Sequence, residues 1–189
     1  DVEDIPGALW KQKWFDEFRK DVAPELVKIV VAIDPAVTSK ATSDEVGIIG
    51  AGVGIDGRYY VIADRSGIMS PDKWGNRAIN LYKEFNADRI IAEVNNGGDL
   101  VETVLRTIEP NIPYTAVVAS RGKITRAEPI AALYEQGKIS HIGKFEELET
   151  QCCEYLPGDK SPDRMDALVW AITYLMENSG KIKYFVDTI

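Results

Sequence analysis

Ile29-Val30-Val31-Ala32-Ile33-Asp34-Pro35 is an apolar run that ends in an acid and a proline. Most of its apolar residues are β-branched, and no polar residue interrupts them. This pattern is typical of a central strand that is covered on both faces. We therefore expect a buried strand that stops at Asp34-Pro35 and carries a carboxylate at its carboxyl end.

The neighbouring segments predict a mixed α/β sheet. Val46 to Ile55 and Tyr59 to Ala63 are strand candidates joined by Asp56-Gly57, a dipeptide that favours a hairpin, so the first three strands should be antiparallel neighbours. After Pro71, helical and strand patterns alternate, which indicates parallel crossovers. The further predicted strands are Ile90 to Ala92 and Tyr114 to Ala119, and the predicted helices lie at about 74–85, 100–108, 126–136, 145–155 and 162–179, the last capped by Ser161.

The composition describes one domain and limits its partners. The 189 residues are 45% hydrophobic, and the net charge of −8 argues against holding nucleic acid by bulk electrostatic attraction. The sequence has no apolar run long enough for a membrane span and no signal peptide, so we expect a cytosolic protein. The adjacent Cys152 and Cys153 indicate reduced thiols. Residues 1–27, with a short helix over Leu9 to Arg19, are predicted as a lead-in outside the core of a chain excised from a longer one.

Asp34 and Glu93 each follow a short apolar strand, at the end where open α/β sheets bind their ligands. If these strands are neighbours, both carboxylates enter one crevice, where they repel each other unless a cation lies between them. A turn role before Pro35 is an alternative for Asp34. That alternative is weaker for Glu93, because Asn95-Asn96-Gly97-Gly98 already supplies the turn residues.

A third acid lies on the last predicted helix. Asp163 falls in the first turn, where the helix dipole favours a carboxylate that has no further role. Asp166 lies deeper among core-directed residues and costs stability there unless something binds it, although a half-exposed flank position is an alternative. Asp34, Glu93 and Asp166 together provide oxygen ligands of the kind that Mg²⁺ or Mn²⁺ takes.

Two metal ions in such a cluster suit phosphodiester hydrolysis, since one activates water and the other stabilises the leaving oxygen. Bound cations would also supply the positive charge that this acidic chain lacks. A small basic island of Arg121, Lys123 and Arg126 lies between a predicted strand and a helix, a position suited to phosphate contacts. An ordinary solvated loop explains this island equally well.

Several other chemistries are excluded by missing motifs. The sequence has no G-x-x-x-x-G-K-[ST] loop for ATP hydrolysis and no G-x-G-x-x-G between a strand and a helix. His141 is the one histidine of the chain, which argues against a zinc site and a catalytic triad and favours a structural role.

Four acidic motifs follow one another along the chain: Asp34-Pro35, Ser43-Asp44-Glu45, Ala92-Glu93-Val94-Asn95-Asn96-Gly97-Gly98 and Ser161-Pro162-Asp163-Arg164-Met165-Asp166-Ala167-Leu168-Val169-Trp170-Ala171. In this order they resemble the C-terminal nuclease domain of large terminase subunits, the DNA-packaging motors of tailed bacteriophages and related particles. Gly7-Ala8-Leu9-Trp10, Arg121-Gly122-Lys123 and Arg126-Ala127-Glu128-Pro129 are also similar to that family. The resemblance therefore covers nearly the whole chain.

The resemblance implies an RNase H-like fold, in which three antiparallel strands and then parallel strands are flanked by helices. Residues 28–189 would be a metal-dependent endonuclease domain that cuts concatemeric viral DNA, and a packaging ATPase would precede residues 1–27. Asp34, Glu93 and Asp166 would be the catalytic metal ligands and Asp163 a second-tier ligand. Asp44 and Asp64 are further acids near the expected cleft, for which a structural role is the alternative.

Our leading hypothesis is an endonuclease with two Mg²⁺ or Mn²⁺ ions, in which Asp34 bridges both ions while Glu93 and Asp166 hold one each. The expected partners are double-stranded DNA, the ATPase domain, the portal and the small terminase subunit, in the cytoplasm of a bacterial host and without a membrane. One alternative is another RNase H-like nuclease, such as a junction resolvase or an RNA:DNA hybrid nuclease. A second is a catalytically silent docking module, in which Trp10, Trp14 and Tyr184-Phe185-Val186 contact partners.

Overall fold

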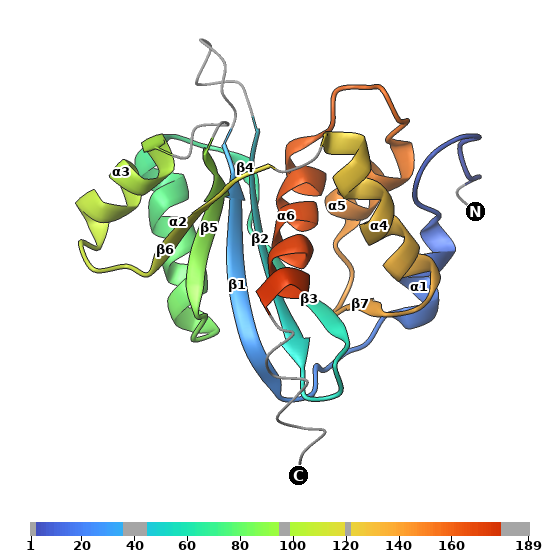
Figure 1. The fold of residues 1–189 in the computed structure, drawn as a ribbon, viewed down its shortest axis with the longest axis horizontal. Coiled ribbons are helices and arrows are strands. Elements are labelled where there is room, and N and C mark those ends of the chain that lie inside the picture. The colour runs from blue at the N-terminus through green and yellow to red at the C-terminus, as the bar shows by residue number, and fades with distance from the viewer. Residues whose placement is uncertain (1–2, 36–44, 95–98, 120–121, 179–189) are drawn as a thin grey trace.

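A mixed β-sheet forms the centre of the chain in the computed structural model, which describes residues 3–35, 45–94, 99–119 and 122–178 (Figure 1). Over this part the strand order is β6-β5-β1-β2-β3-β7, and β4 pairs with β2 outside that path. The strands are β1 (Leu26–Asp34), β2 (Glu45–Gly54), β3 (Tyr59–Asp64), β4 (Gly67–Ile68), β5 (Arg89–Glu93), β6 (Tyr114–Val117) and β7 (Ile139–His141).

The predicted topology is confirmed. β1 pairs antiparallel with β2, and β2 pairs antiparallel with β3. The β2–β3 connection turns at Gly57, whose φ of 78° is a conformation that glycine adopts easily. β5 pairs parallel with β1 and β6 with β5, as the alternation of helices and strands predicts. The two shortest strands, β4 and β7, were not predicted, since so few residues show no periodicity.

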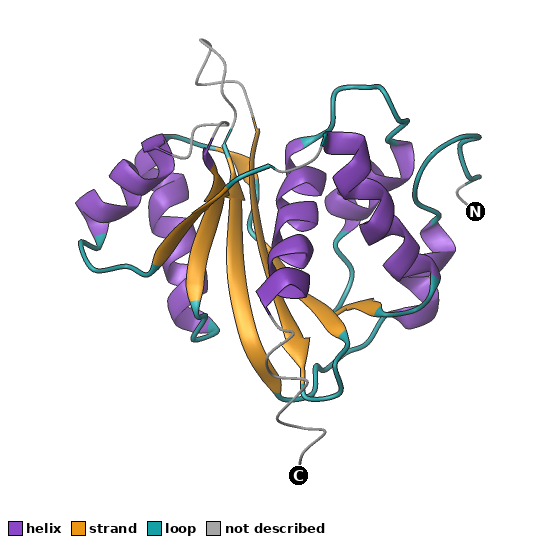
Figure 2. Cartoon of the chain, in the orientation of Figure 1, coloured by secondary structure: helices purple, strands orange, loops and turns teal. Residues whose placement is uncertain are grey.

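Helices cover both faces of the sheet (Figure 2). α2 and α3 lie on one face, and α6 packs on the other face against β1 and β2, with α4 and α5 beside it. The helices are α1 (Gln12–Phe18), α2 (Pro71–Glu84), α3 (Asp99–Ile108), α4 (Lys123–Glu135), α5 (Glu146–Glu154) and α6 (Asp163–Asn178). In the part of the chain that the structure describes, no helix has both the length and the apolarity to cross a membrane.

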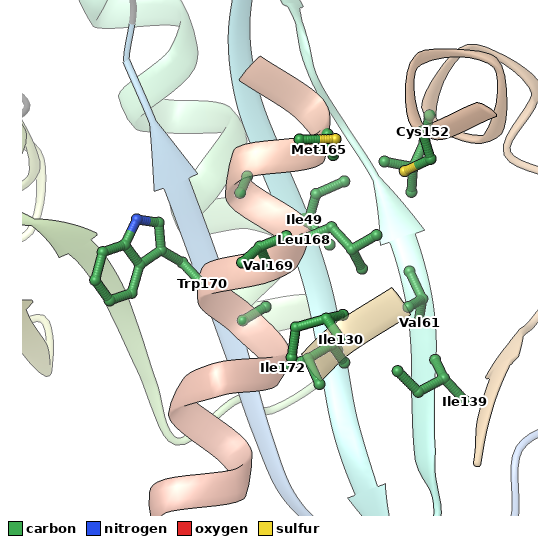
Figure 3. Packing of buried hydrophobic residues seen from close by; sticks show 14 of the residues in the cluster. Ile49, Val61, Ile130, Ile139, Cys152, Met165, Leu168, Val169, Trp170 and Ile172 are labelled. Atoms are coloured by element: carbon green, nitrogen blue, oxygen red, sulfur yellow. The ribbon is translucent and has the colours of Figure 1, made fainter. Parts of the chain in front are cut away.

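β1 shows why its sequence is apolar throughout. Successive side chains of a strand point to opposite faces. Val30 and Ala32 join the core cluster on the α6 side, whereas Val31 and Ile33 join the cluster on the α2 side. The strand is therefore buried on both faces. Figure 3 shows the α6 side, where helix side chains such as Leu168 gather with residues of β2, β3 and α4.

The N-terminal segment belongs to the core. Trp10 and Phe15 are each only 1% exposed, and both rings meet the ring of Tyr134 on α4 edge-on. The expectation that residues 1–27 stay outside the core is therefore wrong for these side chains. Trp10 is also too deeply buried to contact a partner, whereas Trp14 is half-buried and Tyr184-Phe185-Val186 lies outside the described residues.

Candidate metal centre

Asp34 and Glu93 end adjacent parallel strands. In the β1–β5 pairing Ile33 lies opposite Ala92, so the next residue on each strand is an acid. Neighbouring strands are about 4.8 Å apart. The two carboxylates therefore leave the same end of the sheet from positions one strand apart, as the sequence predicts.

Both acids face α6. Asp34 follows Val30 and Ala32 in the alternation of β1, and Glu93 follows Ile91 in β5; these three apolar residues all belong to the core cluster on the α6 side. Asp34 is 2% exposed and Glu93 is half-buried. An ionised carboxylate at so buried a position needs groups that stabilise its charge, and a divalent cation is one that its oxygens are suited to bind.

A glycine allows α6 to reach this edge of the sheet. Gly47 of β2 pairs with Asp34, and a Cβ atom on Gly47 would lie 2.2 Å from the carbonyl oxygen of Asp163 and 3.0 Å from the Cβ of Ala167. The backbone of β2 therefore touches the first turn of α6 directly beside Asp34. Figure 1 shows the carboxyl ends of β1 and β5 at the same end of the molecule as the start of α6.

The first turn of α6 adds two acids, Asp163 and Asp166, which are both half-buried. Ser161 was expected to cap this helix with its hydroxyl oxygen. Instead, that hydroxyl donates a hydrogen bond of 2.8 Å to the Asp166 carboxylate, and the helix begins at Asp163. We call Asp34, Glu93, Asp163 and Asp166 the acidic edge.

The acidic edge fits a hard divalent cation by its chemistry. Its donors are carboxylate oxygens, which Mg²⁺ and Mn²⁺ prefer. In the described ranges, no three or more acids, histidines or cysteines are already close enough together to hold one ion. Asp34 and Glu93 end neighbouring strands, and Asp163 and Asp166 begin α6 at the same end of the sheet.

Asp64, one of the two further acids, forms an ion pair with Arg164. Nη1 of Arg164 donates a 2.7 Å hydrogen bond to Oδ2 of Asp64, and the side chains are 11% and 5% exposed. Burial by itself lowers the pKa of Arg164, but the bond to Asp64 and the charges of Asp64 and Glu45 raise it above its ordinary value. The guanidinium therefore stays charged. Asp44 lies outside the described residues.

The basic island is described only in part. Arg121 falls outside the described residues, and Lys123 begins α4 with a side chain that is likewise not described. The guanidinium of Arg126 lies over the indole ring of Trp170, 4.6 Å from its centroid, and both residues line a cavity of about 240 Å³ between α4 and α6. Trp170 is one helical turn after Asp166, so Arg126 contacts α6 one turn away from the acidic edge.

Sequence reasoning missed a second group of polar residues, which we call the Glu149 cluster: Arg19, Tyr134, His141 and Glu149. Nη1 and Nη2 of Arg19 each donate a 2.7 Å bond to the Glu149 carboxylate. Nδ1 of His141 is 2.9 Å from that carboxylate, and Nε2 is 2.6 Å from the Tyr134 hydroxyl. An ionised carboxylate only accepts, so Nδ1 donates to Glu149 and Nε2 accepts from Tyr134.

Burial raises the pKa of Glu149, but the hydrogen bonds from Arg19 and His141 outweigh it and lower the pKa to about 2. Burial lowers the pKa of His141. Both ring nitrogens of this buried histidine are occupied by protein groups, which supports the structural role expected for it. No local signal could have revealed the cluster, because Arg19 and Glu149 are 130 positions apart in the sequence.

Comparison with known proteins identifies the family. The family model described as the terminase RNaseH-like domain matches residues 31–176. The chain belongs to this family. The match begins within β1 and ends within α6, so it includes the whole acidic edge of this terminase RNaseH-like domain. None of the curated proteins matches the chain.

Solved structures show the same fold. The large terminase of a thermophilic bacteriophage is 13% identical, with a TM-score of 0.66, and the similarity covers 94% of this chain and 46% of that one. The nuclease domain of the large terminase subunit gp2 of bacterial virus Sf6 is 15% identical, with a TM-score of 0.64 and coverages of 87% and 98%. The human cytomegalovirus terminase nuclease domain, manganese-soaked and with an inhibitor bound, is 15% identical, with a TM-score of 0.63 and coverages of 90% and 95%.

The RNase H-like fold that the sequence motifs implied is therefore confirmed. The chain spans less than half the length of the thermophilic bacteriophage's large terminase, and about the full length of the two nuclease domains.

Proposed function

We propose that this terminase RNaseH-like domain is a metal-dependent endonuclease that cuts DNA by two-metal phosphodiester hydrolysis. The observation that carries the proposal is the arrangement at the acidic edge. Asp34 and Glu93 end adjacent parallel strands, and the first turn of α6 touches the strand next to Asp34. Three elements thus carry acids at the same end of the sheet, where divalent cations would offset the repulsion among their carboxylates.

Asp34 is central in this arrangement, between Glu93 on β5 and the acids of α6. Asp34, Glu93 and Asp166 would therefore hold the Mg²⁺ or Mn²⁺ ions, with Asp163 as a second-tier ligand. When bound, the ions would activate water and stabilise the leaving oxygen of the phosphodiester. The hydroxyl of Ser161 would hold the Asp166 carboxylate in one orientation. The manganese-soaked cytomegalovirus domain, which shares the fold, supports this choice of metal.

Double-stranded DNA is the proposed substrate. The net charge of −8 makes the intrinsic affinity for DNA weak, so binding would depend on the metals and on Arg121, Lys123 and Arg126. The match to only part of a large terminase supports a place in a packaging motor that cuts concatemeric viral DNA. A packaging ATPase would then precede residues 1–27, and the portal and small terminase subunit would be partners in the host cytoplasm.

A plasmid-nicking assay in Mn²⁺ tests the proposal. Asp34→Ala and Asp166→Ala should abolish cleavage while the protein stays folded, because each removes a metal ligand. Asp88→Asn is a matched control, since Asp88 accepts a hydrogen bond from the backbone of Ile29 and lies just before β5, at the end away from the acidic edge. The proposal is wrong if folded Asp34→Ala and Asp166→Ala cut as fast as the parent.

Two other functions remain to be separated from this one. A junction resolvase or hybrid nuclease would prefer four-way junctions or RNA:DNA hybrids over linear duplex in a direct comparison. A silent docking module would leave the acidic edge without metal at millimolar Mn²⁺, whereas a nuclease would take up two ions about 4 Å apart. The burial of Trp10 has already removed one of the contacts that a docking role would use.

A further inference from the structure

Arg164 lies between the two acids of α6 and connects this helix to three other elements. Its guanidinium donates to Asp64 at the end of β3 and lies 3.2 Å, through Nε, from Oε1 of Glu45 at the start of β2. Its backbone N–H donates a 3.2 Å bond to Oε1 of Gln151 on α5. Nε2 of Gln151 in turn donates a 2.7 Å bond to the same oxygen of Glu45. These contacts close a ring that holds both the main chain and the side chain of Arg164.

The ring meets a requirement of the helix. The first N–H groups of a helix have no partner within the helix, and those of a buried helix start need one elsewhere. Gln151 supplies that partner for Arg164. The first turn of α6 is thereby attached to α5 through its backbone and to β2 and β3 through a side chain, independently of the contact at Gly47.

The two attachments lie on different sides of the helix. Asp163 and Ala167, one turn apart, meet Gly47. Arg164 projects about 100° around the helix axis from Asp163 and about 200° from Asp166, and it reaches β3 and α5. The Gly47 contact sets how closely α6 approaches the sheet, and the Arg164 contacts set how its first turn is rotated. That rotation decides where the carboxylates of Asp163 and Asp166 lie.

The burial of the pair shows that it is not an ordinary surface ion pair. The Arg164 and Asp64 side chains are 11% and 5% exposed, whereas the neighbouring Arg65–Glu84 pair has exposures of 38% and 51%. Loss of one member of a buried pair leaves the other charge uncompensated, so the geometry is strongly maintained. Pairs that orient metal ligands without touching the metal commonly change metal affinity by 10–100-fold when they are removed.

We propose that Arg164 is a positioning residue of the metal centre, which orients Asp163 and Asp166 through Asp64, Glu45 and Gln151, and that Asp64 is its counter-ion and not a metal ligand. This inference rests on the proposed function and adds to it a residue that touches neither metal nor DNA. It also gives a role to Asp64, an acid near the cleft that the acidic edge does not include.

Direct Mn²⁺ binding, followed by the electron paramagnetic resonance signal of free Mn²⁺, tests the role in the 189-residue chain. Arg164→Gln should weaken Mn²⁺ binding by roughly 10–100-fold and lower kcat for plasmid cleavage by a similar factor, with KM for DNA unchanged. Arg164→Lys keeps the charge opposite Asp64 and should recover part of the loss. Arg65→Gln, which breaks the exposed neighbouring pair, is the matched control and should match the parent.

A double variant tests the role assigned to Asp64. If Asp64 acts through Arg164, Asp64→Asn should add no further loss of Mn²⁺ affinity in the Arg164→Gln background. Losses that multiply would mean that Asp64 binds metal by itself and would overturn the assignment. Urea unfolding of each variant shows whether the affinities belong to folded protein, and Arg164→Lys is compared with the parent if Arg164→Gln does not fold.

The two proposals fail in different ways. A parent chain that neither binds Mn²⁺ nor cuts DNA would contradict the proposed function. A parent that does both, together with folded Arg164→Gln and Arg164→Lys that match it in Mn²⁺ affinity and kcat, would contradict the positioning role alone.

Discussion

The Glu149 cluster and the acidic edge differ in what surrounds their carboxylates. In the Glu149 cluster, one carboxylate receives two bonds from Arg19, one from His141 and one from the backbone N–H of Phe145. At the acidic edge, four acids lie where β1 and β5 end and α6 begins. In the first arrangement an arginine and a histidine surround one carboxylate, whereas the second places four acids at one end of the sheet.

This difference indicates which group serves the fold and which serves a ligand. Substitution of one partner of a buried ion pair lowers stability strongly, because the other partner is left as an uncompensated buried charge. Gathered like charges cost stability, and such a cost is common where function requires it. Substitutions in the two groups should therefore affect stability with opposite signs.

The largest loss of stability should follow Glu149→Gln. The substitution leaves Arg19 without its buried counter-charge. We expect the free energy of unfolding to fall by about 3 kcal/mol. This value is at the lower end of the range for broken buried pairs, because Arg19 is partly exposed. Urea denaturation measures it. Glu147→Gln, on an exposed position of the same helix, should change stability by less than about 0.5 kcal/mol. Equal losses for the two variants would remove the distinction between the Glu149 cluster and an ordinary surface.

Gly47→Ala should damage both the fold and the metal centre. The added Cβ would overlap the carbonyl oxygen of Asp163, so we expect a loss of about 1–3 kcal/mol. Displacement of α6 by about 1 Å should lower cleavage roughly 100-fold. Thermal unfolding and plasmid nicking measure the two effects. Gly50→Ala on the same strand, where the nearest atom is 3.4 Å away, is the control and should keep most of the activity.

Mild acid should weaken the Glu149 cluster through His141. Burial lowers the pKa of His141, so its stabilising contribution is complete above the unfolded value near 6.5 and is lost as the pH falls below it. We expect stability to fall as the pH drops from 6.5, by at most about 1.4 kcal/mol per pH unit for a single histidine. The contribution of Glu149, whose pKa is about 2, should be lost only between about pH 4.5 and 2.

Urea unfolding at a series of pH values measures this loss. The chain has one histidine, so a slope between pH 6.5 and 5.5 that persists in His141→Gln would contradict the assignment.

Asp34→Asn should give the smallest change in stability, with the opposite sign. Removal of one charge from the acidic edge should raise the free energy of unfolding in EDTA by up to about 1 kcal/mol, because it relieves repulsion from the neighbouring acids. Added Mn²⁺ should stabilise the parent and not this variant. A marked loss of stability in EDTA would show that Asp34 serves the fold and would weaken its role as a ligand.

Local patterns along the chain predicted most of the fold. The apolar run before Asp34 predicts a strand buried on both faces, and β1 is one. The alternation after Pro71 predicts parallel neighbours, which place Asp34 beside Glu93. Such features follow from periodicity and from the residue types at strand ends, and both are local properties of a sequence.

Contacts between distant segments could not be predicted in this way. By strict alternation from Val61, Asp64 would face α2, since Val61 belongs to the cluster on the α6 side. An irregularity in the β2–β3 register, where Ala51 pairs with Val61 but Gly50 pairs with Ala63, inserts one residue in β3 and returns Asp64 to the α6 side, where it meets Arg164. The sequence indicated Asp64 as an acid near the cleft but not its partner.

The sequence by itself determined the order and type of the main elements and the position of the acids at strand and helix ends, because those depend on neighbours a few residues away. Tertiary structure alone decided which acids pair with an arginine. The approach of α6 at Gly47, the pairing of Arg164 with Asp64 and the contact of Arg19 with Glu149 all join segments far apart in the chain. The packing of helices onto a twisted sheet brings those segments together, and no local pattern encodes it.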